Sequence, residues 1–166
     1  SESLDWTVFE TGQTVEFGDM KIESFSVPHD VAAVGYVFDD GRSRLFYATD
    51  LGMVTEQVRQ NFRFCDAAIL ESNHDAGLLH SSGRPKKLIS RIAGRSGHLS
   101  NDDACSLVSE CAPERLRLLM LAHLSEECNT RQLAHSNMVR ALKKCRREAV
   151  RLEILPQNEA SGFFDF

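Results

Sequence analysis

Histidine and carboxylate side chains stand at the ends of short apolar runs in this 166-residue sequence. His29 lies in the run Pro28-His29-Asp30, and Asp50 ends the stretch that begins at Tyr47. The imidazole and carboxylate of such a pair suit Zn²⁺ or Mn²⁺, and one predicted hairpin between them would let both side chains point into one pocket. A surface histidine and an aspartate that caps the following helix would explain the pair equally well.

Three more side chains occupy comparable positions. His123 directly follows an apolar run, Glu71 follows another, and His98 stands just before Ser100 and Asn101, either of which is expected to cap the next helix. Each of these side chains could bind a metal ion or act as an acid or a base. Taken alone, His123 could also be a core or loop histidine.

The other three histidines are expected outside a first ligand shell. His74 follows Glu71 closely and could line the pocket. His80 and His135 fall on predicted polar helix or loop faces, where contact with solvent is the ordinary role.

The first third of the chain, which must position His29 and Asp50, alternates as strands do. β-Branched and aromatic residues dominate it, and glycine or aspartate punctuates it, with Asp40-Gly41 as a hairpin signal. The predicted strands are Thr7 to Phe9, Thr14 to Phe17, Met20 to Val27, Val34 to Phe38 and Leu45 to Ala48.

After Asp50 the pattern changes to helices that alternate with short apolar strands. Helices are expected over Met53 to Phe62, Pro85 to Ile92, Asn101 to Cys111 and Arg131 to Arg146, and strands over Ala67 to Leu70, Leu116 to Leu121 and Ala149 to Leu155. A meander followed by such units predicts an α/β fold, in which a mixed sheet is layered with helices.

Composition narrows the class of protein. The formal charge of −5 argues against a uniformly basic nucleic-acid binder, so charge has to be considered locally. The five cysteines contain no C-x-x-C pair, which predicts reduced thiols and a cytoplasmic location. No apolar run is long enough for a membrane span, and the length fits one domain.

Four runs in this order resemble the YycJ/WalJ-type nucleases of the metallo-β-lactamase fold: Ala48 to Leu51, Glu71 to Asp75, Gly97 to Asn101 and Ala122 to Ser125. The resemblance extends from about Phe25 to Leu155. It implies an αβ/βα sandwich with helices on the outside, two divalent metal ions (zinc or manganese), and hydrolysis of a phosphodiester by a metal-bridged hydroxide.

The same resemblance implies roles for individual residues. His29 and His123 would be metal ligands, and Asp50 the carboxylate that bridges the two metals. His98 would donate a proton or contact phosphate, and Glu71 would orient its ring.

The H-x-H-x-D-H loop that supplies most ligands of the first metal in this fold occurs nowhere in the sequence. We therefore expect residues 1–166 to be the C-terminal part of a metallo-β-lactamase domain with little activity of its own. Half of a two-sheet sandwich would expose an apolar face, so a homodimer or a complex with the missing half is expected.

The substrate is predicted from local charge. Basic residues precede His98 in the sequence. We expect Arg84, Lys86, Lys87 and Arg95, with Ser100 and Asn101, to bind substrate. Basic residues on an ordinary solvated helix face would give the same pattern. The predicted substrate is DNA, and the resemblance implies 5′-to-3′ exonuclease activity in the full-length parent. Hydrolysis of small phosphodiesters or esters and a non-catalytic binding or regulatory role are the alternatives.

Overall fold

The strand-forming first third folds into an antiparallel meander. In the computed structural model, which describes residues 8–166, β1 (Thr14–Phe17), β2 (Met20–Val27), β3 (Ala33–Asp39) and β4 (Arg44–Ala48) pair in sequence order. The predicted turn joins β3 to β4: Gly41 adopts a φ of 79°, and the Asp40 carboxylate accepts hydrogen bonds from the backbone N–H groups of Arg42 and Ser43.

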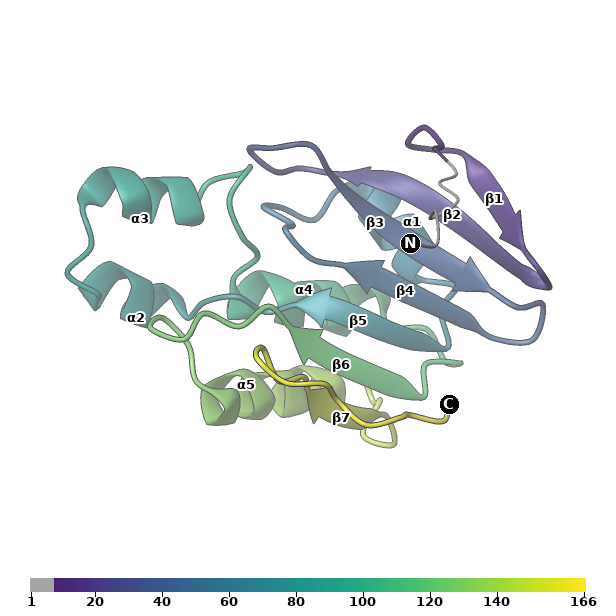
Figure 1. Cartoon of the computed structure of the whole chain (residues 1–166). Helices are drawn as coiled ribbons and strands as arrows, with labels where there is room; N and C mark the ends of the chain where they lie inside the picture. Colours follow the sequence, from purple (N-terminus) through teal and green to yellow (C-terminus); the bar gives the residue numbers. More distant parts are fainter. Residues whose placement is uncertain (1–7) are drawn as a thin grey trace.

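The rest of the sheet is parallel. β5 (Ala67–Glu71), β6 (Leu118–Ala122) and β7 (Arg151–Ile154) follow β4 in order, so the seven strands run β1 to β7 across one mixed sheet (Figure 1). Parallel neighbours need crossover connections. These contain α1 (Glu56–Phe62), α2 (Ala76–Ser81), α3 (Lys86–Ile92), α4 (Asn101–Cys111) and α5 (Arg131–Lys144).

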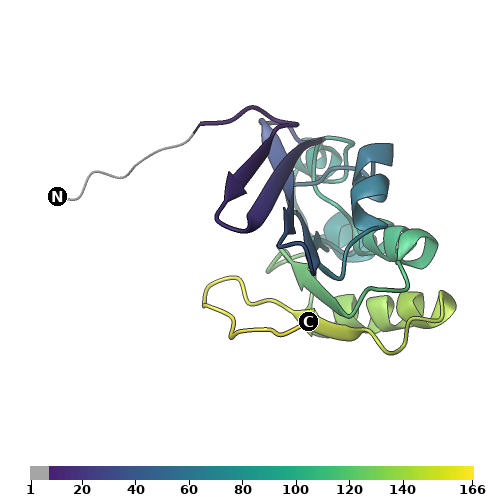
Figure 2. The same ribbon diagram turned by 90° about the vertical axis from the view of Figure 1, so that its right-hand side faces the viewer.

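The main core lies between the sheet and α1, α4 and α5. Phe25 and Phe46 of the sheet are fully buried there with Phe62 of α1, Leu107 of α4 and Met138 of α5. Figure 2 shows these helices on one side of the sheet only. Burial of these apolar side chains is the main interaction that stabilises the packing of the helices on the sheet, and it thereby keeps the strand ends in place.

The opposite face carries a smaller apolar cluster. Ala67, Leu118 and Met120 are buried there, and Leu45 and Phe164 are among the partly buried residues that pack against them. Among the described residues no helix covers this face (Figure 2). Leu155 and Phe164 of the C-terminal segment pack on this cluster and leave its central residues almost fully buried.

The expected α/β class and mixed sheet are confirmed, with differences at element ends. The helix expected from Met53 begins at Glu56, because the Thr55 hydroxyl caps it. Asp50 is therefore not a helix cap, which removes the alternative explanation of that residue. The helix expected to reach Arg146 ends at Lys144, and Arg146 itself has a φ of 57°.

Two predictions about elements were wrong. α2 was not expected; its N-cap is Asp75, and its one buried residue is Leu79, too little apolar periodicity to detect in the sequence. In the strand expected over Thr7 to Phe9, Thr7 lies outside the described residues, and Val8 and Phe9 adopt no regular structure. No helix in residues 8–166 has the length and apolar character needed to cross a membrane.

Candidate metal centre and active site

The candidate site lies where three parallel strands end. Asp50 follows β4 closely, Glu71 is the last residue of β5, and His123 follows β6 directly. Asp50 and His123 adopt left-handed backbone conformations, with φ of 54° and 56°. Non-glycine residues rarely adopt this region, and such outliers concentrate at functional sites. The two left-handed residues turn the chain out of its strands at the edge where Glu71 ends β5.

Four side chains meet at this edge. Asp50, Glu71, His98 and His123 each place one ligand-type atom within 4.8 Å of the others. Asp50 Oδ1 lies 3.8 Å from His98 Nδ1 and 3.6 Å from His123 Nδ1. Two imidazoles and two carboxylates form a donor set that suits a borderline divalent cation such as Zn²⁺ or Mn²⁺.

Glu71 is the shared hydrogen-bond acceptor of this group. Its Oε1 accepts from Nδ1 of both His98 and His123 at 2.8 Å, and its Oε2 accepts from the backbone N–H of Leu51 at 2.6 Å. Burial would raise the pKa of the fully buried Glu71, but these hydrogen bonds outweigh it and the pKa lies below its usual value. The hydrogen bond to Glu71 raises the pKa of His123. In the neutral form of each ring, donation to the Glu71 carboxylate places the proton on Nδ1 and leaves the lone pair on Nε2.

His29 lies beside the four-residue group. Its Nδ1 is 2.8 Å from the carbonyl oxygen of Gly97, and its Nε2 is 3.3 Å from Asp30 Oδ1 and 3.8 Å from Asp50 Oδ1. Donation from Nδ1 to a carbonyl leaves Nε2 as the nitrogen that faces the carboxylates. The expected proximity of His29 and Asp50 is thus observed, and His29 as a metal ligand stays a prediction.

Two glycines allow the loops of the site to approach closely. A Cβ on Gly97 would lie 2.1 Å from the Ile92 carbonyl oxygen, and one on Gly52 would lie 2.5 Å from the Arg95 carbonyl oxygen. Both neighbours are backbone atoms that cannot move aside cheaply. Gly97 therefore brings the backbone that carries His98 against the end of α3, while its carbonyl holds His29.

Ser100 caps α4, as one of the two predicted alternatives. Its hydroxyl accepts from the backbone N–H of Asp103. Asn101 is only 1% exposed, and its carboxamide is bonded to Ser72 and Asn129. The expectation that Asn101 contacts substrate is inconsistent with this position, because its polar atoms are already used inside the protein.

The sequence did not single out the asparagines that fix the His123 loop. The Asn73 carboxamide donates to the carbonyl oxygen of His123 at 2.8 Å, and the Asn129 carboxamide donates to the carbonyl oxygens of Ser72 and Asn73. Asn73 lies within the Glu71 to Asp75 run, which was a signal. Asn129 follows β6 at a position that sequence patterns do not distinguish from an ordinary loop.

The basic residues divide into free and engaged side chains. Lys86, Lys87 and Arg95 are exposed, and none forms an ion pair within residues 8–166. Arg84 pairs with Glu127 at 2.7 Å, and Arg91 pairs with Asp30. Their predicted contacts with substrate phosphates stay predictions.

None of the remaining histidines belongs to the four-residue group. His80 and His135 are exposed. His74 is 2% exposed, its Nδ1 is buried without a hydrogen-bond partner, and burial lowers its pKa.

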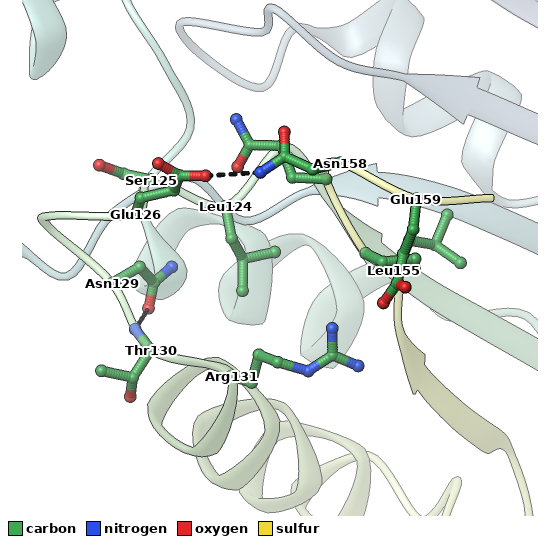
Figure 3. A pocket seen from close by; sticks show the side chains of 11 residues that line it. Leu124, Ser125, Glu126, Asn129, Thr130, Arg131, Leu155, Asn158 and Glu159 are labelled. Carbon is green, nitrogen blue, oxygen red and sulfur yellow. Dashed lines mark hydrogen bonds between the residues drawn. The ribbon is translucent and has the colours of Figure 1, made fainter. Parts of the chain in front are cut away.

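Two hollows border the site. One, of about 280 Å³, is lined by His98 and His123 together with Asn73, Leu79, Arg84, Ile92, Leu124 to Cys128 and Gln157. The other, of about 490 Å³, lies between the loop after β6 and the segment after β7 (Figure 3). A hydrogen bond from Asn158 to Glu126 crosses its rim (Figure 3). Leu124, Ser125, Glu126 and Gln157 line both hollows.

Sequence comparisons agree on one family. A family model described as the beta-lactamase superfamily domain matches residues 1–123. Exodeoxyribonuclease WalJ of Streptococcus pneumoniae serotype 2 is 38% identical over 136 residues, which are 81% of this chain and 51% of that protein. Exodeoxyribonuclease YycJ of Bacillus anthracis is 31% identical over 138 residues, 82% of this chain and 52% of that protein.

A solved structure of the metallo-β-lactamase fold is also similar to this chain. The metallo-β-lactamase fold protein YhfI from Bacillus subtilis superposes with a TM-score of 0.64 at 16% identity, covering 89% of this chain and 51% of that protein. At this identity the likeness concerns the fold alone. The chain spans about half the length of the curated relatives that it matches.

Proposed function

This chain belongs to the beta-lactamase superfamily, on the branch of the WalJ and YycJ proteins, and from that premise we propose that it forms part of a metal-dependent phosphodiesterase acting on DNA. The observation that carries the proposal is the convergence of Asp50, Glu71, His98 and His123 within 4.8 Å at the ends of adjacent strands. The names of both relatives describe DNA exonucleases. For the parent protein we propose digestion from the 5′ end.

The donor set fits divalent metal ions. Asp50, His29 and His123 would hold them, because the Asp50 carboxylate lies beside the imidazoles of both histidines. The proposed complement is two ions, zinc or manganese. When bound, they would polarise the phosphodiester and lower the pKa of water.

The residues of this chain would then divide the remaining work. His98 is held at Nδ1 by Glu71, so Nε2 carries the second proton when the ring is protonated, and this is the proton that it would give to the departing oxygen. Lys86, Lys87 and Arg95 are exposed and would bind phosphates as point charges or forks. Asp50 is 42% exposed at its side chain, which leaves the site open to a phosphate.

Further ligands would come from a segment outside residues 1–166, since the described residues supply too few donors for two tightly held ions. We propose that such a segment, or a second copy of the chain, packs on the side of the sheet that carries no helix among the described residues, where Leu45 and Ile69 are only partly buried. The five cysteines are all free thiols, which favours a reducing, cytoplasmic location.

The test is metal-dependent digestion of 5′-labelled and 3′-labelled DNA by the full-length parent protein. Asp50→Asn should abolish digestion, because a neutral amide is a poor ligand for divalent ions. Asp102→Asn, an equal change of charge in the first turn of α4, should retain it. Full activity of the Asp50 variant would remove Asp50 from the metal site. Hydrolysis of small model phosphodiesters without digestion of DNA would redirect the proposal to the small-molecule alternative.

A further inference from the structure

The segment that contains α2 and α3 projects beyond the sheet (Figure 1). We call residues 76–97 the arm. Within it α3 has no buried residue, and α2 buries only Leu79. Because apolar burial does not fix α3 itself, polar contacts at its two ends matter for where it lies. At the C-terminal end of α3 the Arg91 side chain pairs with Asp30, which follows His29 in the chain.

Just before the N-terminal end of α3, Arg84 forms an ion pair with Glu127 of the loop after β6. Its Nη2 and Nε donate to the same carboxylate oxygen of Glu127, at 2.7 and 3.2 Å. Arg84 is 25% exposed at its side chain and Glu127 is 71% exposed. An ion pair that open to water holds its partners weakly, so exchange for another anion costs little.

The ion pair lies at a hollow that two histidines of the proposed site, His98 and His123, also line. The cavity of about 280 Å³ has Leu79, Arg84 and Ile92 of the arm on its walls, and His98 and His123 among its other residues. A ligand in this cavity would touch the guanidinium and the two imidazoles together. A guanidinium presents two parallel N–H groups to a phosphate as well as to a carboxylate.

We propose that Glu127 occupies Arg84 as a stand-in for phosphate in the free protein, and that a phosphate of the DNA strand replaces it when substrate enters the cavity. This rests on the proposed function and identifies a specific phosphate subsite within it. Glu127 thereby sets the affinity for DNA without touching the reacting atoms. The neighbouring Glu126 accepts from the carboxamide of Asn158 instead, and within residues 8–166 it forms no ion pair with an arginine.

The first experiment measures binding of a 5′-phosphorylated single-stranded oligonucleotide by fluorescence anisotropy, in EDTA so that no turnover occurs. Glu127→Gln should tighten binding about two- to fivefold, the range set by the strength of an exposed ion pair. Arg84→Gln should weaken it about tenfold. In the double variant Arg84→Gln/Glu127→Gln the gain from the Glu127 change should vanish.

Glu126→Gln is the matched control, because it removes the same charge one residue away without releasing an arginine. It should tighten binding less than Glu127→Gln does. Equal effects of the two glutamate variants, or a gain that persists without Arg84, would reduce Glu127 to general repulsion and overturn the exchange. Weaker binding by Glu127→Gln would do the same, and would make the ion pair a structural contact.

A second measurement separates this inference from the proposed function. The Nε–H resonance of Arg84 is followed by NMR while inorganic phosphate is added, and it should shift at lower phosphate concentration in Glu127→Gln. A response to phosphate without DNA binding would sustain the phosphate subsite and reject DNA as the substrate. DNA binding with an Arg84 resonance that ignores phosphate would reject the subsite and leave the proposed function standing.

Discussion

Glu71 holds two histidine rings on a single oxygen atom. Oε1 accepts from His98 and His123, while Oε2 accepts from the backbone N–H groups of Leu51 and Leu99. A carboxylate can accept all four hydrogen bonds, whereas a carboxamide cannot, since one of its two heavy atoms is a donor. The ionised form of Glu71 is therefore what fixes the tautomer of both rings.

Glu71→Gln tests this arrangement with almost no change in volume. If the carboxamide oxygen stays on the backbone N–H groups, its NH₂ group faces both Nδ1 atoms and forces their protons onto Nε2. We expect metal affinity to fall about 10- to 100-fold, the usual effect of losing the group that orients a metal-bound histidine. Isothermal titration with Zn²⁺ or Mn²⁺ measures it, and circular dichroism checks that the variant is folded. Unchanged affinity would show that Glu71 does not set the tautomers.

His98→Ala tests the role of one of the two histidines that Glu71 holds. We expect the variant of the full-length parent to keep its metal content and to lose about 10²-fold or more in turnover, as for a general acid. Elemental analysis and single-turnover kinetics on the same preparation supply the two readings. A parallel loss of metal would reassign His98 as a ligand.

At the scale of elements, the strands must keep their register for the site to form. The ends of β4, β5 and β6 are aligned by one residue at the opposite end of the sheet, Asp66, directly before β5. Its carboxylate accepts from the backbone N–H of Arg44 at 2.8 Å and from the Arg115 guanidinium at 2.7 and 3.0 Å. Asp66 thereby ties the start of β4 to the segment that enters β6.

The hydrogen bonds of Asp66 predict that the stability of the protein depends on pH. Burial would raise the pKa of Asp66, but the hydrogen bond from Arg115 and that from the Arg44 backbone outweigh it and keep the pKa below its usual value. A carboxyl group whose pKa is depressed in the folded state contributes stability above its unfolded pKa, and the contribution is lost as the pH falls through the folded value. The contribution of Asp66 should therefore begin to fall below about pH 4 and be lost as the pH falls further, through the lower folded-state pKa.

Asp66→Asn should lower the free energy of unfolding by about 2 kcal/mol at neutral pH, because it removes the charge from a 4%-exposed group with arginine partners. Urea denaturation from pH 7 to pH 3 measures both effects. The difference between wild type and variant should shrink as the pH falls, and a difference that stays constant would contradict the pKa argument. Asp19→Asn, in the exposed turn between β1 and β2, is the control.

At the scale of the whole molecule, the sheet has two apolar faces and helices on one. Met120 is 4% exposed on the second face, and Phe164 of the C-terminal segment packs against its cluster. The Arg151 guanidinium also lies over the Phe164 ring, 5.3 Å from its centroid. Leu45 and Ile69 at the margin of this cluster stay only partly buried, and we expect this margin to pack against a second layer.

Metal stoichiometry tests how complete the site is. We expect the purified 166-residue chain to bind well below two metal ions, because its described donors are too few for a two-metal site. Elemental analysis after removal of loosely bound metal gives the number, and light scattering on the same sample gives the oligomeric state. Close to two ions per chain would mean that a second copy supplies the missing donors and that the chain is competent by itself.

The sequence alone predicted the order of most elements and singled out His29, Asp50, Glu71, His98 and His123, which the structure brings to one edge of the sheet and whose roles stay predictions. Strand and helix periodicity is local, and a motif is legible wherever its residues are adjacent in the chain. The sequence could not reveal α2, which buries a single residue, or the interior position of Asn101, which depends on Ser72 and Asn129.

Only the tertiary structure decided how these residues act on one another. Glu71 shares one oxygen between two rings, and Arg84 meets Glu127, because parallel strands bring distant loops to one edge of the sheet. The partners are 27, 52 and 43 residues apart along the chain. Such contacts depend on the register of the sheet and on backbone turns such as those at Asp50 and His123, which no local pattern encodes.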